Sequence, residues 1–444
     1  MAEAAGAFYA VETFVEGAVA AVKGIYDPTL PLKTDLVPVK DVDLPRYAHT
    51  VSLVKGRAYV FGGITSKDGT EALTDNDIHV VILPISATEG SDYKRIPSGP
   101  DSPPARHGHS AAVIDDQIYI YGGTSFSNEP LDEDGTVWAF STGTATWTKL
   151  SPSSTSPPPP NRLKHASVAT SHPQKPQKRA DEGLVPQFES DPSKHVPEPD
   201  APFSYGTLIT HGGVLAGSTG SEPLNDVWSF DISSRTWSPL PSPSSPVRAA
   251  PSPSLTMEGS RLYIYAAGGV QFMDLSTSTY SDKGGDGELG VSPLGPWAPV
   301  TRDSSSEGPG ERSGSVVVPI TTGQGRKYLA LMGGEERSAV GESEGKGDVW
   351  TLQLQPEGMS AASFKDAARM AVKKGTGEKE WAEVRYFDSE GVMVQEGQEG
   401  RGIGMRTGFA ADKSRDEDGS TVFVHGGKES GKVRGDGVLV TFGI

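Results

Sequence analysis

Arginines and histidines at recurring positions are the side chains of this sequence best suited to chemistry. One arginine opens each of six short apolar runs, at Arg46, Arg106, Arg162, Arg248, Arg312 and Arg406. A guanidinium group holds its N–H donors in one plane and binds carboxylate, sulfate or phosphate in a bidentate manner. The pattern predicts a site for an anionic ligand. The alternative is that these arginines anchor loops or pair with nearby acids.

Histidines accompany three of the arginines. His49, His109 and His165 each stand three positions after an arginine, and His107 directly follows Arg106. We expect the first three to be hydrogen-bonded structural residues. His107 departs from the shared spacing and is therefore a candidate ligand-facing residue. The sequence holds no zinc signature, Gly-rich phosphate loop or nucleophile elbow.

Short strands must position these side chains. Six Gly-Gly pairs end apolar runs, which predicts strands that enter sharp turns, at residues 59–63, 119–123, 208–213, 262–269, 328–334 and 421–427. The distance from arginine to first glycine is 16 residues in the first two repeats and 50 in the third. Residues 171–204, rich in Pro, Lys, Asp and Glu, account for this excess and are predicted to be a flexible insert.

Two further runs complete each repeat, so four strands are predicted per repeat. A third run starts at Asp77, Thr136, Asp226, Asp348 and Gly437. A fourth run carries an aromatic residue, at Tyr93, Trp147, Trp237, Trp297 and Trp381.

The order R-x-x-H-S/T, Y-x-x-GG, D-V-W-x-F-D and W-x-x-L resembles the kelch family over residues 37–444. The resemblance implies an all-β fold, a six-bladed kelch-type β-propeller with four-stranded antiparallel blades. A WD-type propeller is the alternative, but its Gly-His and Trp-Asp dipeptides are missing from the expected places. The predicted blades lie near residues 46–97, 106–150, 162–240, 248–300, 312–384 and 406–444.

The last repeat ends at its third strand. We expect residues 37–45 to supply the missing strand and close the ring, which removes exposed sheet edges. Residues 1–36 are predicted to form a short N-terminal amphipathic helix and a linker, because Phe8, Val11, Val15 and Val19 recur at helical spacing.

The resemblance also implies which face binds. It places the six arginines around the mouth of the central channel, on the face that carries the loops between second and third strands. In kelch adaptors of ubiquitin ligases, equivalent arginines bind acidic peptides. In kelch-type mutarotases and nitrile-specifying proteins they hold anionic small molecules.

Loop lengths add expectations about the two faces. The segments 335–347 and 382–405 are long and acidic and could form a wall or lid on the binding face, whereas blade four has essentially no loop before Val270. The insert 171–204 and the segment 358–379 are assigned to the opposite face. Ala361, Phe364, Ala368 and Ala371 predict a helix in the second segment, packed under the propeller or docking a partner.

The composition of the chain limits the classes of partner that we expect it to bind. The chain has 444 residues, a net charge of −17 and no cysteine. This charge disfavours nucleic acid and anionic lipid surfaces, and no apolar run approaches the roughly 20 residues that span a bilayer. The first residues carry acids and no basic stretch, so no signal peptide is predicted. We expect a cytoplasmic, monomeric protein.

Metal and cofactor chemistry are not predicted. The loop with Glu189, Asp191 and His195 superficially resembles the iron site of nitrile-specifying proteins, but its spacing differs. Galactose oxidase, a relative by fold, needs a Tyr-Cys crosslink that a chain without cysteine cannot form.

Two hypotheses for function remain. The first is a binding or scaffold protein whose arginine-lined face holds an acidic peptide or partner protein. The second is a stand-alone propeller enzyme, a lyase, isomerase or cyclase, that acts on an anionic small molecule. Its catalytic residues are unknown, with His107, Glu311 and Tyr47 as geometric candidates.

Overall fold

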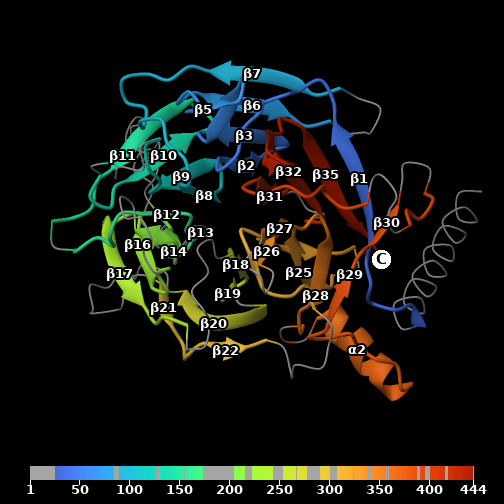
Figure 1. Cartoon of the computed structure of the whole chain (residues 1–444). Coiled ribbons are helices and arrows are strands. Elements are labelled where there is room, and N and C mark those ends of the chain that lie inside the picture. Colours follow the sequence, from blue (N-terminus) through green and yellow to red (C-terminus); the bar gives the residue numbers. More distant parts are fainter. Residues whose placement is uncertain are drawn as a thin grey trace, which may run out of the picture.

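The computed structural model is an all-β chain in which one helix, α2 (Ala361–Ala371), is described (Figure 1). The structure describes residues 26–443 except 85–89, 127–130, 132, 155, 174–204, 216–222, 244–253, 267, 278–290, 301–307, 324, 338–342, 357, 359, 388–390, 396–400 and 416–418. The predicted N-terminal helix, Arg248, most of the insert 171–204 and the Glu189 to His195 loop lie outside the described residues.

The described strands form six sheets of four or five strands. Sheet one consists of β2 (Thr50–Val54), β3 (Arg57–Phe61), β6 (Ile78–Ile82) and β7 (Asp92–Ile96). Sheet two consists of β8 (Ser110–Ile114), β9 (Gln117–Tyr121), β10 (Val137–Ser141) and β11 (Thr146–Leu150). Sheet three consists of β13 (Ala166–Thr170), β14 (Thr207–His211), β16 (Val227–Asp231) and β17 (Thr236–Leu240).

The other three sheets follow in chain order. Sheet four consists of β18 (Ser254–Glu258), β19 (Arg261–Ala266), β20 (Gly269–Thr277) and β21 (Val291–Pro293), with β22 (Ala298–Pro299) also on β20. Sheet five consists of β24 (Val316–Thr321), β25 (Lys327–Met332), β28 (Val349–Gln353) and β29 (Trp381–Glu383). Sheet six consists of β31 (Ala410–Lys413), β32 (Thr421–His425), β35 (Gly437–Gly443), β1 (Lys33–Val39) and β30 (Arg385–Phe387).

Short ribbons extend the loops that follow the Gly-Gly pairs. They are β4 (Ile64–Lys67) with β5 (Thr70–Leu73), β12 (Arg162–Leu163) with β15 (Val214–Leu215), β23 (Arg312–Ser313) with β26 (Glu335–Arg337) and β27 (Ser343–Gly345), and β33 (Lys428–Glu429) with β34 (Lys432–Val433). In four of the six described sheets, the loop between the second and third strands therefore contributes to a short β-ribbon.

The first strands of the sheets lie around a common centre (Figure 1). Each contacts the next in the order β2, β8, β13, β18, β24 and β31, and β31 contacts β2 in turn. Hydrophobic clusters fill the spaces between neighbouring sheets; one joins Tyr59 and Phe61 of sheet one to Ile120 and Phe140 of sheet two. Apolar residues on both faces of these short strands are thereby removed from water.

Segments from the two ends of the chain pair in sheet six. β1 runs antiparallel to β35, with Lys33 opposite Gly443 and Val39 opposite Gly437. The paired segment thus begins ahead of residue 37. Strand β30 adds to the other side of β1 in parallel. None of the helices that the structure describes has the length and apolar character needed to cross a bilayer.

Four expectations about the loops and the helix can be compared with the structure. Ala266 pairs directly with Gly269, as expected for the absent loop of the fourth repeat. The 335–347 segment contains a β-ribbon, and the 382–405 segment contributes β30 to sheet six. The helix at 361–371 is confirmed. Phe364 of its apolar stripe is 68% exposed, while Ala362 is buried, and a role in docking a partner stays a prediction.

Candidate functional site

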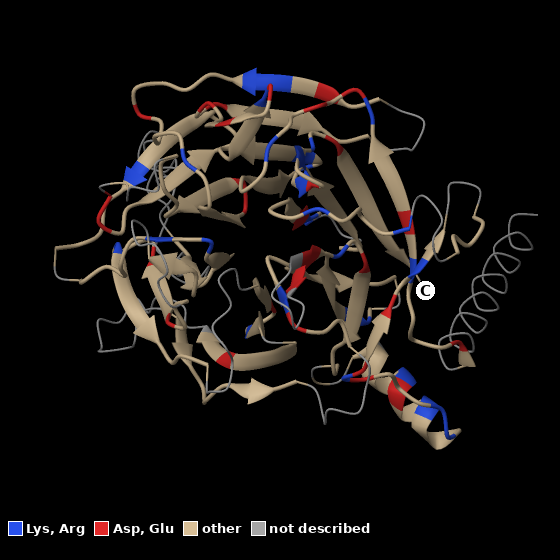
Figure 2. Ribbon diagram, viewed as in Figure 1, with Lys and Arg blue, Asp and Glu red and all other residues tan. Residues whose placement is uncertain are grey.

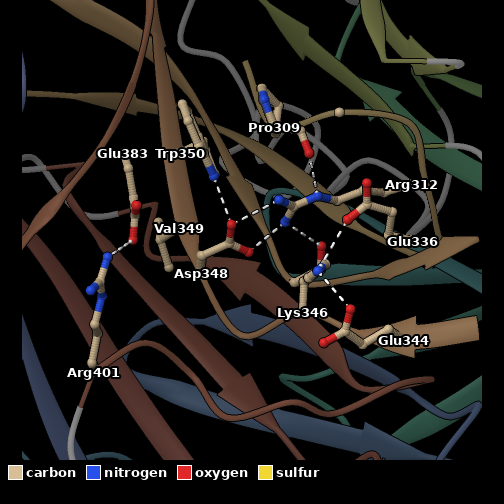
Figure 3. Close-up of polar contacts among 12 residues, drawn as sticks. Pro309, Arg312, Glu336, Glu344, Lys346, Asp348, Val349, Trp350, Glu383 and Arg401 are labelled. Atoms are coloured by element: carbon tan, nitrogen blue, oxygen red, sulfur yellow. Dashed lines mark hydrogen bonds and ion pairs between the residues drawn. The ribbon is translucent and has the colours of Figure 1, made fainter. Parts of the chain in front are cut away.

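Sheet five shows how one recurring arginine is held (Figure 3). The Arg312 guanidinium donates two hydrogen bonds to the Asp348 carboxylate, of 2.5 and 2.7 Å. Its Nε donates to the Pro309 carbonyl at 2.7 Å, and Nη1 also donates to the Gly333 carbonyl at 3.3 Å. The Trp350 indole donates to the same carboxylate at 2.8 Å. Arg312 is 5% exposed, whereas Asp348 and Trp350 are half-buried.

The same arrangement recurs in other sheets. Arg106 pairs with Glu133 at 2.6 and 2.8 Å, and Arg162 pairs with Asp226 at 2.7 and 2.8 Å. Both arginines are 0% exposed, and each also donates to a Gly-Gly carbonyl. In sheet six the Arg406 guanidinium contacts Asp436 at 3.1 and 3.3 Å. Each pair ties the start of the first strand to the loop that enters the third strand.

Arg46 in sheet one departs from this pattern. The equivalent carboxylate, Asp77, pairs with Arg95 and accepts from the Ser98 amide instead. Arg46 donates from Nη1 to the Gly62 carbonyl at 3.2 Å, and its Nε is buried without a partner. Among the described residues Arg46 forms no ion pair. Burial lowers the pKa of Arg46 below its ordinary value, and the nearby Asp75 offsets this in part.

The paired carboxylates are charged at neutral pH. Burial alone would raise the pKa of Asp226 and of Asp348. Hydrogen bonds and positive charge from Arg162 and Arg312 outweigh that effect, so both carboxyl pKa values lie below their ordinary value. A charged pair with its hydrogen bonds satisfied can remain in the interior.

The recurring histidines pack between neighbouring sheets. His109 Nε2 lies 2.9 Å from Thr50 Oγ1, His165 Nε2 lies 2.7 Å from Ser110 Oγ, and His49 Nε2 lies 2.9 Å from His425 Nδ1. As expected, these rings are buried and hydrogen-bonded. Burial lowers the pKa of His165 and of His425 to about 3, so both are neutral at pH 7.

These histidines also explain the glycines opposite them. A Cβ on Gly122 would lie 2.6 Å from His165 Cε1, and one on Gly426 would lie 2.8 Å from His49 Cε1. Both glycines have positive φ, which other residues rarely adopt. The Gly-Gly pair therefore makes room for the histidine of the adjacent sheet.

A cavity of about 370 Å³ opens beside the arginine-bearing loops. Tyr47, Lys164, Glu335, Thr407 and Phe409 are among its lining residues. We call it the mouth cavity. A second cavity, of about 280 Å³, follows the first strands and includes Ser52, Ser167 and Thr256. Asp412, Lys413 and Arg415 line it as well. The two cavities lie along the same set of inner strands.

Charges around the mouth cavity are mixed in sign, as Figure 2 shows for the centre of the view. Lys428 pairs with Glu71 at 2.7 Å, and Lys346 pairs with Glu336 and Glu344. Lys164 is exposed, and its ammonium has no ion pair or hydrogen bond within the described part of the chain. Of these three lysines, Lys164 is the one free to meet an anion.

Tyr47 lines the mouth cavity, whereas His107 is not among its lining residues. Burial, together with Glu71, raises the pKa of the Tyr47 hydroxyl to about 12. His107 is 7% exposed, and its backbone pairs with that of Thr124. Burial, with a smaller contribution from Lys164, lowers the pKa of His107, which keeps its ring neutral at pH 7.

Comparisons with known proteins agree with this geometry. A family model described as "KLHDC2/KLHL20/DRC7 Kelch-repeats domain" matches residues 32–174, and the Kelch motif matches residues 214–244. Kelch domain-containing protein 1 of Mus musculus is 32% identical over 24% of this chain and 23% of its own length. Kelch domain-containing protein 3 of Bos taurus is 24% identical over 51% of this chain and 50% of its own.

Kelch repeats are present in this chain, over residues 32–174 and 214–244.

Two further matches bear on how far the likeness extends. The Rho GTPase-activating protein gacHH of Dictyostelium discoideum is 32% identical over 26% of this kelch chain but over 7% of its own length. The chain spans half or less of these curated relatives. A solved structure, "Structure of YjhT", is 13% identical with a TM-score of 0.51, covering 91% of this chain and 99% of that one. That likeness supports the kelch propeller fold alone.

Four of the five described arginines of this repeated set form ion pairs with carboxylates inside the protein. In the four units described for Arg106, Arg162, Arg312 and Arg406, the guanidinium faces a carboxylate of its own sheet. Their role in ligand binding therefore stays a prediction.

The carboxylate partners carried a signal in the sequence that motif reasoning passed over. Asp226 and Asp348 open D-V-W triplets, and the tryptophan of each triplet donates to that aspartate.

A second group in this kelch chain was also missed. His79 Nδ1 lies 2.7 Å from the Tyr93 hydroxyl, and His79 Nε2 lies 2.8 Å from Asp75 Oδ1. Arg46 acts electrostatically on both His79 and Tyr93. Tyr93, at the end of this hydrogen-bonded chain, is 41% exposed. His79 and Tyr93 stand on the neighbouring strands β6 and β7 and Asp75 precedes β6, so repeat spacing does not reveal the arrangement.

Proposed function

We propose that this kelch protein is a binding module that holds an acidic segment of a partner protein at the mouth cavity. The observation that carries the proposal is the unpaired Lys164 ammonium at a cavity of about 370 Å³. Ribbons such as β4 with β5 and β33 with β34 stand on the same side as the cavity-lining loops. A partner segment entering the cavity would meet backbone edges and the Lys164 ammonium.

Of the recurring arginines, Arg46 is the one to which this proposal gives a role in binding. The other described arginines already hold carboxylates, and displacing these would leave a buried charge unpaired. Arg46 has no such partner among the described residues, and the next residue, Tyr47, lines the cavity. We propose Lys164 as the first contact for an acidic ligand and Arg46 as the second. A neutral His107 beside Lys164 adds no competing charge.

A fluorescent peptide of eight residues with four glutamates, paired with a glutamine version, tests the proposal by anisotropy. Lys164→Gln should weaken binding of the acidic peptide about two- to fivefold, the equivalent of an exposed ion pair. Lys55→Gln is the matched control, because the Lys55 side chain is 78% exposed and does not line the mouth cavity. Equal binding of both peptides, or no effect of Lys164→Gln, contradicts the proposal.

Six closed blades form the scaffold in this proposal. The contact of β31 with β2 and the pairing of β1 with β35 support a closed ring of six sheets. The chain has no cysteine, so Lys33→Cys with Gly443→Cys creates a single possible disulfide. Residues paired in antiparallel strands are close enough for one. We expect the disulfide to form and to raise stability by about 3 kcal/mol. Failure to form it in the folded protein argues against closure.

An enzyme is the second candidate, favoured by the chain from Tyr93 through His79 to Asp75. A histidine oriented by a carboxylate can move a proton to or from a phenol hydroxyl. Burial lowers the pKa of His79 despite Asp75, so the ring is neutral and able to accept a proton at pH 7. Arg46 would hold the anionic group of a small substrate beside it. This site serves a lyase or isomerase acting on a small carboxylate.

Thermal shift with acetate, succinate and citrate separates the two candidates. A ligand at 100 times its Kd stabilises by about 2.7 kcal/mol. The enzyme candidate predicts stabilisation by a carboxylate that Arg46→Gln abolishes and Lys164→Gln leaves unchanged. Stabilisation that depends on Lys164 alone, or none at all, counts against a substrate site at Tyr93.

A further inference from the structure

The polarity of α2 is inverted relative to a typical surface helix. Such helices turn an apolar stripe inward and charged residues outward. In α2, Asp366 and Arg369 are 3% and 4% exposed, while Phe364 and Met370 are 68% and 63% exposed.

Polar contacts fix this orientation. Asp366 forms an ion pair with Arg326 at 2.5 Å, and Arg326 is itself 2% exposed. Arg369 donates from Nε to the Gly375 carbonyl at 2.9 Å. A capping box of Ser360 and Ser363 fixes the start of the helix. Rotating α2 to bury Phe364 would expose these buried charges to solvent and break their bonds. The outward apolar face is therefore the stable arrangement.

The exposed face forms a continuous apolar stripe. Phe364, Ala367 and Ala371 recur at spacings of three and four, and all are exposed. Val372, 44% exposed, extends the stripe beyond the helix end. Exposed apolar surface of this kind marks an interaction site.

We propose that residues 1–25 of the same chain cover this stripe. These residues lie outside the described part of the structure. The first described residues are held against α2, because Arg369 Nη1 donates to the Asp27 carbonyl at 2.5 Å. Thr29 Oγ1 donates to the Thr376 carbonyl at 2.8 Å, just beyond the end of the helix. The segment is thus tethered to α2, whose outer face contacts none of the described residues that would cover it.

The sequence of residues 1–25 matches the stripe in pattern. Phe8, Val11, Val15 and Val19 recur at spacings of three and four, which is the complement that an apolar helix face needs.

Charge complementarity points the same way. The segment carries Glu12 and Glu16 beside its apolar positions. Lys373 and Lys374, both exposed, follow α2, and Lys365 lies within it. In a chain of net charge −17 this is a local basic rim. An acidic amphipathic segment therefore fits the stripe better than a second copy of α2 would, because two copies would bring lysines together.

The reach of the segment is sufficient. The 11 residues of α2 span roughly 16 Å at 1.5 Å per residue. The residues between Val11 and Val22 cover a similar length if helical. The segment is covalently joined to the residues that contact α2. Its effective concentration at the stripe is therefore near the millimolar range, well above that of a second molecule in dilute solution.

Disulfide trapping in the full chain tests the proposal, because no native cysteine competes. Val11→Cys, Val15→Cys and Val19→Cys are each combined with Ala367→Cys and oxidised by copper phenanthroline at micromolar protein. We expect at least one pair to form an intrachain disulfide about a hundredfold faster than interchain dimer forms. Glu16→Cys with Ala367→Cys is the control off the stripe, and Val15→Cys with Lys55→Cys is the control off the helix.

The outcomes separate the possible occupants. Selective intrachain disulfides that slow about tenfold or more on adding Phe364→Asp support the proposal. Phe364 is exposed, so this substitution leaves the fold intact, as circular dichroism would verify. Interchain disulfides whose rate rises with protein concentration would assign the stripe to a second copy and overturn the proposal. Equal trapping in the controls, or none, also overturns it.

Discussion

Lowering the pH from 7 to 5 should destabilise this protein through its buried histidines. Burial lowers the pKa of His165 and His425 to about 3 and that of His211 to about 4. In the unfolded chain the same side chains have a pKa of about 6.5. Between these values the unfolded state binds more protons than the folded state. Stability is therefore complete above the unfolded pKa and is lost as the pH falls toward the folded pKa.

The magnitude follows from those pKa values. At pH 5 an unfolded histidine is almost fully protonated while the folded one is neutral, which costs about 2 kcal/mol per residue. His165, His211 and His425 together then lose roughly 6 kcal/mol. The carboxylates contribute little in this window, because unfolded Asp titrates near pH 4. A loss of this size is comparable with the whole stability of an ordinary domain.

Guanidinium denaturation at pH 7, 6 and 5, followed by tryptophan fluorescence, measures the effect. Among the seven tryptophans, Trp237 is buried within the cluster between sheets two and three. We expect the midpoint to fall steeply between pH 6 and 5. His165→Gln should reduce the pH slope by about one proton, or 1.4 kcal/mol per pH unit. A flat midpoint from pH 7 to 5, or an unchanged slope in His165→Gln, would refute the reasoning.

Three other substitutions test the packing of the repeats. Asp348→Asn leaves the buried Arg312 guanidinium without its charge partner and should cost about 3–5 kcal/mol in urea unfolding. Arg261→Gln breaks the ion pair with Asp274, whose two side chains are 25% and 41% exposed, and should cost under about 1 kcal/mol. Equal losses of stability in Asp348→Asn and Arg261→Gln would contradict this difference in burial. Gly122→Ala places a Cβ 2.8 Å from the Arg162 carbonyl oxygen, whereas no atom lies within 4 Å of a Cβ at Gly391. Gly122→Ala should therefore lower the melting temperature more than Gly391→Ala does. The opposite order would be inconsistent with tight contact between the sheets. Ser360→Ala removes the side-chain cap of α2 and should cost about 1 kcal/mol locally, seen as faster amide exchange in residues 361–371, with Ser234→Ala in an exposed turn as control.

Repeat spacing made the strands of this fold predictable. Each apolar run that ends in Gly-Gly became a second strand, as in β3 and β9, because a short continuous apolar run and a positive-φ glycine are local signals. The hydrogen-bonded role of His109 and His165 was also predictable, because their spacing from arginine recurs.

The direction in which side chains point was harder to predict from the sequence. The helix at 361–371 was expected from its spacing, but the spacing did not show that Phe364 would face outward. Burial of Asp366 depends on Arg326, which directly precedes β25 of sheet five. Helical periodicity shows that a stripe exists but not which neighbour it meets.

The sequence by itself determined the repeated strands, the glycine turns and the positions of the arginines, because these follow from local backbone preferences and from the spacing of residues along the chain. Only the tertiary structure decided what the arginines do. Whether Arg162 faces a ligand or Asp226, and why Arg46 lacks the partner that Asp77 gives to Arg95, depend on loops that return to the same sheet from elsewhere in the chain. A guanidinium binds whichever carboxylate the fold brings within reach, and residue spacing alone cannot specify that choice.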